Sequence, residues 1–295
     1  MRNVRFGRFE ISKIADMENV LYAPERMYPD ATPEKLRAVQ AILGPRLLDP
    51  GLQLILSFNC YVIRTGGHTI LVDSCIGNDK DRPTRPPWHR RQGPFLETLR
   101  SLGVTPESVD FVLCTHLHAD HVGWNTRLVN GEWVPTFPNA QYLIAEVEYR
   151  YWRAEHDRNP PEPVLHGSFA DSVLPVVARG QAKMVAMDHQ VVPGIHLEGT
   201  PGHTPGAVVI HVEDAGSRAV LCGDMLHHPV QVIHPEWSTH FCVDPDMSRR
   251  SRQDFVRRHA ETGTSILTGH FPAPTAGQIR RDGARHRFMF SDVAE

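Results

Sequence analysis

The sequence lacks the features of several specialised protein classes. No apolar run approaches the roughly 18 residues of a transmembrane helix. The N-terminus MRNVRFGRFE lacks the apolar core of a signal peptide. No basic stripe is present and the formal net charge is only -3, which argues against a nucleic-acid partner. We therefore expect neither a nucleic-acid nor a membrane partner, and a cytoplasmic location.

Cysteine is scarce and shows no pairing pattern. The five cysteines are odd in number and widely spaced, without a C-x-x-C pair. Four of them lie inside or beside apolar runs, so we expect reduced thiols used as small buried side chains. The five are Cys60, Cys75, Cys114, Cys222 and Cys242.

No low-complexity segment, fixed-period repeat or flexible linker divides the chain. Short β-rich runs alternate with helical segments, which favours a layered α/β structure. We predict a hairpin with a primed turn at Gly66-Gly67 and a helix from about residue 245 to 262. We expect residues 1–50 to form an N-terminal extension packed on a core of residues 51–295, a single domain overall.

Histidine is unusually abundant, with 18 residues, and is concentrated in the stretch THLHADHVGWN. This stretch places His116, His118, Asp120 and His121 directly after the apolar run VDFVLC, a predicted buried strand. A loop at the carboxyl end of a strand is a common place for ligands. Imidazole and carboxylate groups at this density indicate a metal site rather than a solvated loop.

Further candidate ligands follow other predicted strands. His203 lies in the turn EGTPGHTPGA, Asp224 ends the run AVLCGD, and His270 ends SILTGH. A single histidine after a strand is more often an ordinary loop residue. The recurrence of one structural position is what supports a shared metal site.

With these motifs the chain resembles the metallo-β-lactamase superfamily. The resemblance rests on THLHADH, TPGHTPG, CGD, TGH and ILVDSC, which span most of the chain. It implies an α/β fold, an αββα sandwich of two mixed β-sheets with flanking helices, and a site for two divalent metal ions. Zinc is expected first, with manganese, iron or cobalt as alternatives.

The resemblance also implies a role for each motif residue. The first metal would be held by His116, His118 and His203. The second would be held by Asp120, His121 and His270, with Asp224 bridging the two. Asp73 would support the metal loop without binding metal.

The implied chemistry is attack by a metal-bridging hydroxide, with Asp120 as ligand and candidate proton shuttle. The residues after Asp224 read GDMLHHPVQ. Related quorum-quenching lactonases carry a tyrosine where this chain has His227, so the chain looks more like the methyl-parathion-hydrolase branch. His227 is a candidate catalytic donor to the substrate or leaving group, with a supporting loop role as the equal alternative.

The substrate pocket is less well marked. Candidate wall residues are aromatic, although each is more often a core residue. They are Phe58, Trp124, Trp152, Trp237 and Phe271. The basic stretches RPTRPPWHRR (82–91) and RRSRQDFVRRH (249–259) are interpreted as a surface loop and a solvated helix face.

The leading hypothesis is a dinuclear metal-dependent hydrolase of a small, largely neutral ester or lactone. Alternatives are an organophosphate triester hydrolase, a β-lactamase and a non-catalytic metal-binding protein. The expected partner is a small-molecule substrate, and the resemblance suggests a homodimer.

Overall fold

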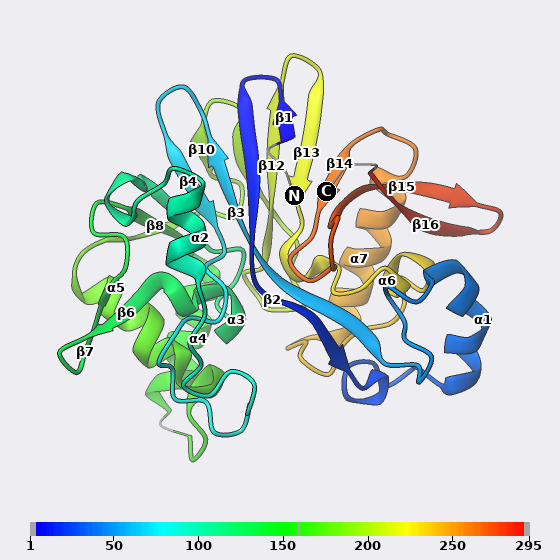
Figure 1. Cartoon of the computed structure of the whole chain (residues 1–295), viewed down its shortest axis with the longest axis horizontal. Coiled ribbons are helices and arrows are strands. Elements are labelled where there is room, and N and C mark those ends of the chain that lie inside the picture. Colours follow the sequence, from blue (N-terminus) through cyan, green and yellow to red (C-terminus); the bar gives the residue numbers. More distant parts are fainter. Residues whose placement is uncertain (1–3, 159, 292–295) are drawn as a thin grey trace. The chain divides into compact units, whose positions relative to one another are not determined.

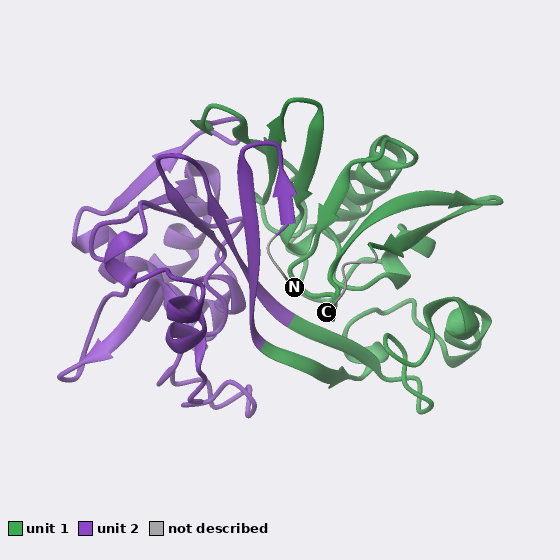
Figure 2. Cartoon of the chain, turned by 45° about the horizontal axis from the view of Figure 1, so that its top comes forward, with its two compact units in different colours: residues 1–2, 17–57, 190–295 green, residues 3–16, 58–189 purple. Residues whose placement is uncertain are grey.

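The computed structural model describes residues 4–158 and 160–291. The chain forms two compact units, coloured separately in Figure 2. Unit 1 comprises residues 1–2, 17–57 and 190–295, and unit 2 comprises residues 3–16 and 58–189. Each unit is therefore assembled from segments that are far apart in the sequence.

The sheet of unit 2 has seven strands in the order β1-β2-β3-β4-β5-β8-β9 (Figure 1). Strand β1 pairs with β2, and β3 with β4, in antiparallel fashion, whereas β4, β5, β8 and β9 run parallel. Strands β2 and β3 continue into residues of unit 1. The bounds are β1 Val4–Phe6, β2 Phe9–Tyr22, β3 Leu54–Arg64, β4 Thr69–Val72, β5 Phe111–Leu113, β8 Gln141–Ala145 and β9 Ala182–Val185.

Unit 2 also contains short helices and a separate hairpin of two strands. Apolar residues of α2, α4 and α5 pack against a core formed by the buried strands β3, β4, β5 and β8. The helices and hairpin strands are α2 Phe95–Ser101, η2 Pro106–Ser108, α3 Ala119–Val122, η3 Gly123–Asn125, β6 Thr126–Val129, β7 Glu132–Pro135, α4 Glu146–Asp157, η4 Val164–Gly167, η5 Phe169–Val173 and α5 Leu174–Ala178.

The sheet of unit 1 has seven strands that follow one another in sequence order, from β10 to β16. All neighbours are antiparallel except β13 and β14, which are parallel. The bounds are β10 Gln190–Val192, β11 Ile195–Gly199, β12 Val208–Asp214, β13 Ser217–Leu221, β14 Ser265–Leu267, β15 Ala276–Asp282 and β16 Arg285–Phe290.

The main helices of unit 1 begin at clear capping residues. The side chains of Thr32 and Asp244 accept hydrogen bonds from the third helical N–H of α1 and α7, and a proline follows each cap. Two clusters of buried apolar side chains hold this unit together. The helices are η1 Pro24–Arg26, α1 Pro33–Leu43, η6 Gly223–Met225, α6 Val230–Ile233 and α7 Pro245–His259.

The predicted fold class is confirmed, because two large mixed sheets and flanking helices are present. The hairpin at Gly66-Gly67 is also confirmed, but its primed turn is wrong because neither glycine has a positive φ. The Thr65 hydroxyl oxygen accepts hydrogen bonds from the N–H groups of Gly67 and His68 and closes the turn instead. Among the described residues, no helix is long and apolar enough to cross a membrane.

Candidate metal centre

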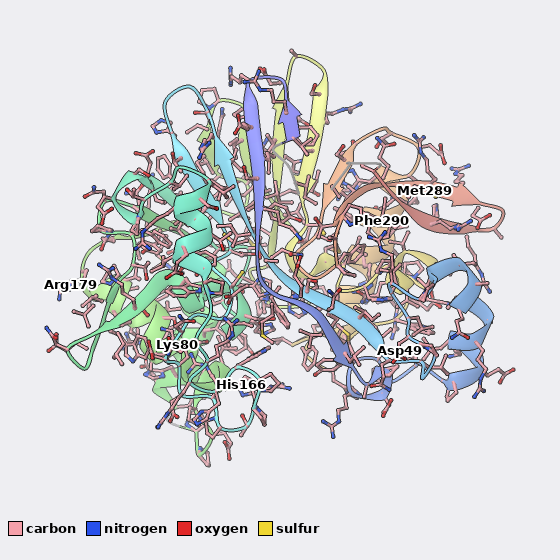
Figure 3. The ribbon with its side chains drawn as sticks, viewed as in Figure 1. Asp49, Lys80, His166, Arg179, Met289 and Phe290 are labelled. Atoms are coloured by element: carbon pink, nitrogen blue, oxygen red, sulfur yellow. The ribbon has the colours of Figure 1, made fainter. Side chains whose placement is uncertain are left out.

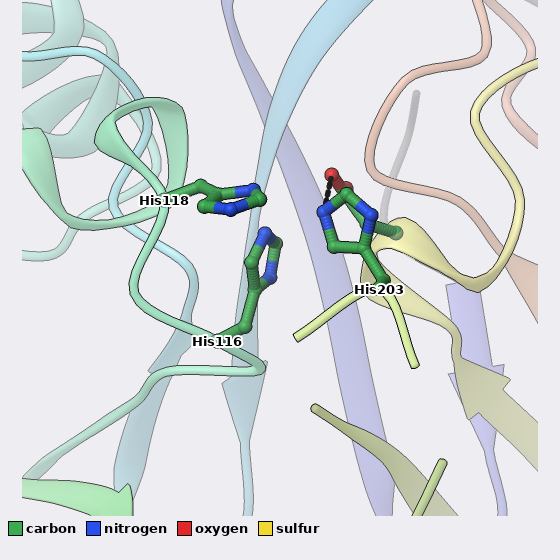
Figure 4. A group of neighbouring side chains, drawn as sticks. His116, His118 and His203 are labelled. Carbon is green, nitrogen blue, oxygen red and sulfur yellow. Dashed lines mark ion pairs between the residues drawn. The ribbon is translucent and has the colours of Figure 1, made fainter. Parts of the chain in front are cut away.

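The histidine-rich loop leaves the carboxyl end of strand β5 in unit 2. His116 and His118 lie side by side (Figure 4), with their ring centroids 4.6 Å apart. The ring centroids of His116 and His121 lie 4.1 Å apart. Asp120 Oδ2 lies 3.8 Å from His121 Nε2. The loop and helix α3 thus bring together the four predicted ligands of this unit.

Asp73, just after strand β4, fixes this loop through both carboxylate oxygens. It accepts hydrogen bonds from Thr115 N (2.8 Å), Thr115 Oγ1 (2.8 Å) and His121 Nδ1 (2.9 Å). The side chain is buried, so these bonds form in an environment that strengthens them. Asp73 therefore holds both ends of the loop, the supporting role that the family resemblance implies.

Glu148 on helix α4 is a supporting residue that the sequence interpretation missed. Its Oε1 accepts hydrogen bonds from Leu117 N (3.0 Å) and Trp152 Nε1 (2.7 Å), and the side chain is only 1% exposed. Leu117 is the residue between His116 and His118. The spacing of Glu148 and Trp152 puts them on one helix face, a signal that could have identified the pair.

The candidate ligands of unit 1 surround one buried carboxylate. Asp224 Oδ2 lies 3.0 Å from His203 Nε2 and 3.1 Å from His227 Nε2, while Asp224 Oδ1 lies 2.9 Å from His270 Nε2. The dashed line in Figure 4 marks the ion pair of His203. The turn after β11 and the loops after β13 and β14 supply these residues. Three separate strand ends therefore converge within this unit.

Four of the candidate histidines differ from His227 in the surroundings of ring nitrogen Nδ1. In each of the four, Nδ1 has a polar partner on the protein. The pairs are His116 with Thr115 Oγ1 (3.1 Å), His121 with Asp73 Oδ2 (2.9 Å), His203 with Cys242 Sγ (3.5 Å) and His270 with Ser57 O (3.1 Å).

Metal-binding histidines are characteristically held in this way, which orients Nε2. Neutral imidazoles combined with carboxylates also match the donors that zinc and other divalent ions prefer. The residues present therefore fit divalent metal ions.

His227 differs from those four residues. Its Nδ1 is buried and has no hydrogen-bond partner in the described part of the chain. Burial lowers the pKa of His227 to about 4, although Asp224 opposes this shift. The neighbouring His228 donates from Nε2 to Leu47 O and accepts at Nδ1 from Val230 N, so both of its nitrogens serve the fold.

The aromatic pocket candidates lie mostly in the protein core. Trp124 stacks on Phe95, and Trp237 and Phe271 belong to the two buried clusters of unit 1. Phe58 is 5% exposed. Trp152 is half-buried, with its ring centroid 5.8 Å from that of His118. Trp152 is therefore the candidate whose surroundings best suit a pocket wall.

The first basic stretch is a surface loop and the second presents an exposed helix face, as predicted, but one arginine of each stretch is buried. Arg82 is buried and pairs through two nitrogens with Asp171, which also lies 3.4 Å from buried Lys80 (Figure 3 labels Lys80). In α7, Arg252 is fully buried and bonds to Pro235 O and to two serine hydroxyls. Each of these arginines is buried because it finds hydrogen-bond partners within its own unit.

The profile of the metallo-beta-lactamase superfamily matches residues 56–270. Among curated proteins, an N-acyl homoserine lactonase from Bacillus sp is 28% identical over 185 residues, which are 59% of this chain and 65% of the lactonase. The chain thus matches less than two thirds of that relative's length.

Two solved structures share the fold. The hydrolase AbOPH, described as a member of the beta lactamase superfamily, has a TM-score of 0.82 at 24% identity and covers 99% of this chain and 98% of its own. The dizinc quorum-quenching lactonase AidC has a TM-score of 0.80 at 19% identity, with 100% and 98% covered.

Proposed function

The chain belongs to the metallo-beta-lactamase superfamily, and we propose that it is a metal-dependent hydrolase that uses two divalent ions to cleave a small, largely neutral ester or lactone. The observation that carries this proposal is the pair of buried histidine and aspartate clusters at strand ends, with Nδ1 of four histidines held by the protein.

We assign the ligands by their positions in the family motifs. His116, His118 and His203 would hold one ion. Asp120, His121 and His270 would hold the other, and Asp224 would contact both. When bound, divalent ions polarise a carbonyl oxygen and lower the pKa of a nearby water molecule.

The remaining chemistry belongs to the side chains. Asp120 lies 3.8 Å from His121 Nε2 yet is less buried than His116 and His121, so its carboxylate can pass a proton between water and the leaving group. The buried His227 Nδ1 has no hydrogen-bond partner among residues 4–158 and 160–291, and His227 can hydrogen bond to a substrate oxygen. Trp152 would form part of an apolar wall next to His118.

The lactonase relatives favour a lactone or ester over other substrates. A phosphotriester is the second candidate, because the residues after Asp224 resemble those of the methyl-parathion-hydrolase branch. Zinc is the metal we expect first, because AidC is described as a dizinc enzyme and because imidazole and carboxylate groups are donors that zinc prefers. Cytoplasmic location and a homodimer remain predictions.

Metal analysis combined with a substrate panel tests the proposal. We expect about two zinc ions per chain and the fastest turnover with an N-acyl homoserine lactone or an aryl ester, ahead of a paraoxon-like triester and a chromogenic cephalosporin. Asp120→Ala and His116→Ala should lose about 100-fold or more in kcat/KM. Full metal content and full turnover in both variants would refute the ligand assignment.

A separate variant tests His227. His227→Phe should retain its metal, because the family motifs assign no metal to His227, and should lose about 100-fold in kcat. The substitution removes the hydrogen bond to substrate together with the contact to Asp224. An unchanged kcat would assign His227 to the fold instead.

A further inference from the structure

Cys242 is the cysteine that departs from the expected pattern. All five cysteines are free, and four are buried, but Cys242 is half-buried and polar groups surround its sulfur. The Sγ atom lies 3.5 Å from His203 Nδ1, 3.3 Å from Thr239 Oγ1 and 3.3 Å from Ser248 Oγ. These contacts are those of a hydrogen-bonding group rather than a packing residue.

The hydrogen bonds around Cys242 indicate that its sulfur accepts a hydrogen bond from His203 Nδ1. Arg252 is a donor only, and its Nη1 donates to Ser248 Oγ (3.2 Å). The Cys242 thiol donates to the same oxygen. The sulfur lone pairs are then available to the N–H at His203 Nδ1.

The buried guanidinium of Arg252 contacts this arrangement through Ser248. Arg252 is fully buried, and within the described residues it forms no ion pair with a carboxylate. Its hydrogen bonds go to neutral oxygens of Pro235, Ser238 and Ser248. Ser248 Oγ thus receives a charged donor from Arg252 as well as the Cys242 thiol.

The backbone holds His203 and Cys242 in register. Val243 N donates to His203 O (2.9 Å), and Asp244 N donates to Gly202 O (3.0 Å). The segment that begins helix α7 therefore runs alongside the turn that carries His203. This pairing fixes the sulfur on the Nδ1 side of the ring, while Nε2 faces Asp224 at 3.0 Å.

We infer that Cys242 is a positioning residue of the metal centre, whose sulfur accepts a hydrogen bond from His203 Nδ1–H and directs Nε2 toward the metal. This inference rests on the proposed function, in which His203 is a ligand. A carboxylate or backbone carbonyl is the usual partner of a metal-binding histidine, and here a thiol takes that place.

The test measures zinc affinity by competition with a chelating dye in three variants. Cys242→Ala should weaken zinc binding about 10- to 100-fold, because Nδ1 loses its acceptor. Cys242→Asp should bind zinc nearly as tightly as the natural protein, because a carboxylate restores the acceptor. Cys242→Ser should fall between them, because its shorter side chain reaches Nδ1 less well. The absorption spectrum of the cobalt-substituted protein should shift in Cys242→Ala and return in Cys242→Asp.

Two controls separate the possible outcomes. Cys60→Ala removes a fully buried thiol from the core of unit 2 and should lower stability without changing zinc affinity. If the natural protein binds no zinc, the proposed function fails. If it binds zinc and His203→Ala does not, but Cys242→Ala and Cys242→Ser bind as tightly as the natural protein, the inference alone is overturned.

A folded Cys242→Asp protein no tighter than Cys242→Ser would also overturn the inference. This comparison decides the matter even when Cys242→Ala does not fold.

Discussion

Two buried carboxylates, Asp73 and Glu148, accept hydrogen bonds from the histidine-rich loop. Glu148 illustrates the energetic consequence, because one of its oxygens accepts from two donors that are shielded from water. Removing a buried acceptor leaves its donors unsatisfied, which costs more than the bond itself contributes.

Glu148→Ala should therefore lower the free energy of unfolding by about 2–4 kcal/mol, as measured by urea denaturation of the metal-free protein. Glu146→Ala is the matched control on the same helix. Glu146 is exposed and, among the described residues, forms an ion pair with Arg150 alone, so its loss should change stability by less than about 0.5 kcal/mol. Equal effects of the two substitutions would contradict a specific role for Glu148.

Lys80 should give stability a measurable pH dependence. Burial lowers the pKa of Lys80 to about 7, although Asp171 opposes the shift, whereas an unfolded lysine titrates near about 10.4. Between these pH values the unfolded chain holds a proton that the folded chain has lost. The free energy of unfolding should therefore rise with pH from about 7 to 10, by up to about 1.4 kcal/mol per pH unit.

Lys80→Met removes this contribution, so the difference in stability between the two proteins should change across that range. Denaturation of both metal-free proteins at several pH values measures the difference. Parallel curves would show that Lys80 keeps an ordinary pKa in the fold.

At the scale of elements, the turn after β11 and the first turn of helix α7 approach each other closely at Gly202. This glycine has φ +130°, and a Cβ there would lie 2.1 Å from Ser248 N. A side chain would have to displace the helix or the turn that carries His203. The position of a candidate ligand therefore depends on the absence of a side chain at its neighbour.

Gly202→Ala should lower the free energy of unfolding by about 1–3 kcal/mol more than the control Gly216→Ala. Gly216 has φ +83° with open space around it, so alanine there meets backbone strain alone. Zinc affinity should fall in Gly202→Ala and stay unchanged in the control. Equal stability and zinc affinity in both would show that the close approach relaxes without effect.

The strand ends that carry the candidate ligands were predictable because local sequence patterns mark them. Apolar runs ending in His116, Asp224 or His270 reveal both the strand and the residue beyond it. The supporting residues were not predictable in this way. Cys242 lies 39 positions from His203, and Arg252 looks like a solvated helix residue until its buried surroundings are known. Only tertiary packing brings such partners together.

At the scale of the whole molecule, each unit carries residues that we propose as metal ligands, so bound metal should stabilise the fold. A ligand present at 100 times its Kd adds about 2.7 kcal/mol to the free energy of unfolding. Chelation should therefore lower the Tm in calorimetry, and added zinc should restore it. In His116→Ala the chelator should lower the Tm by less than in the natural protein. An equally large decrease in Tm would show that the stabilising metal is not bound by His116.

The interleaved composition of the two units has a consequence for synthesis on the ribosome. Unit 2 is complete once residue 189 has emerged, whereas unit 1 needs residues 17–57 together with residues from 190 onward. Residues 17–57 include Met27, Leu36 and Leu54, which are buried in the finished protein. During translation these side chains are made before the residues from 190 onward against which they pack. Exposed apolar segments of this kind are bound by chaperones. We therefore expect a stage of synthesis in which the histidine-rich loop can fold while an apolar segment near the N-terminus is still exposed.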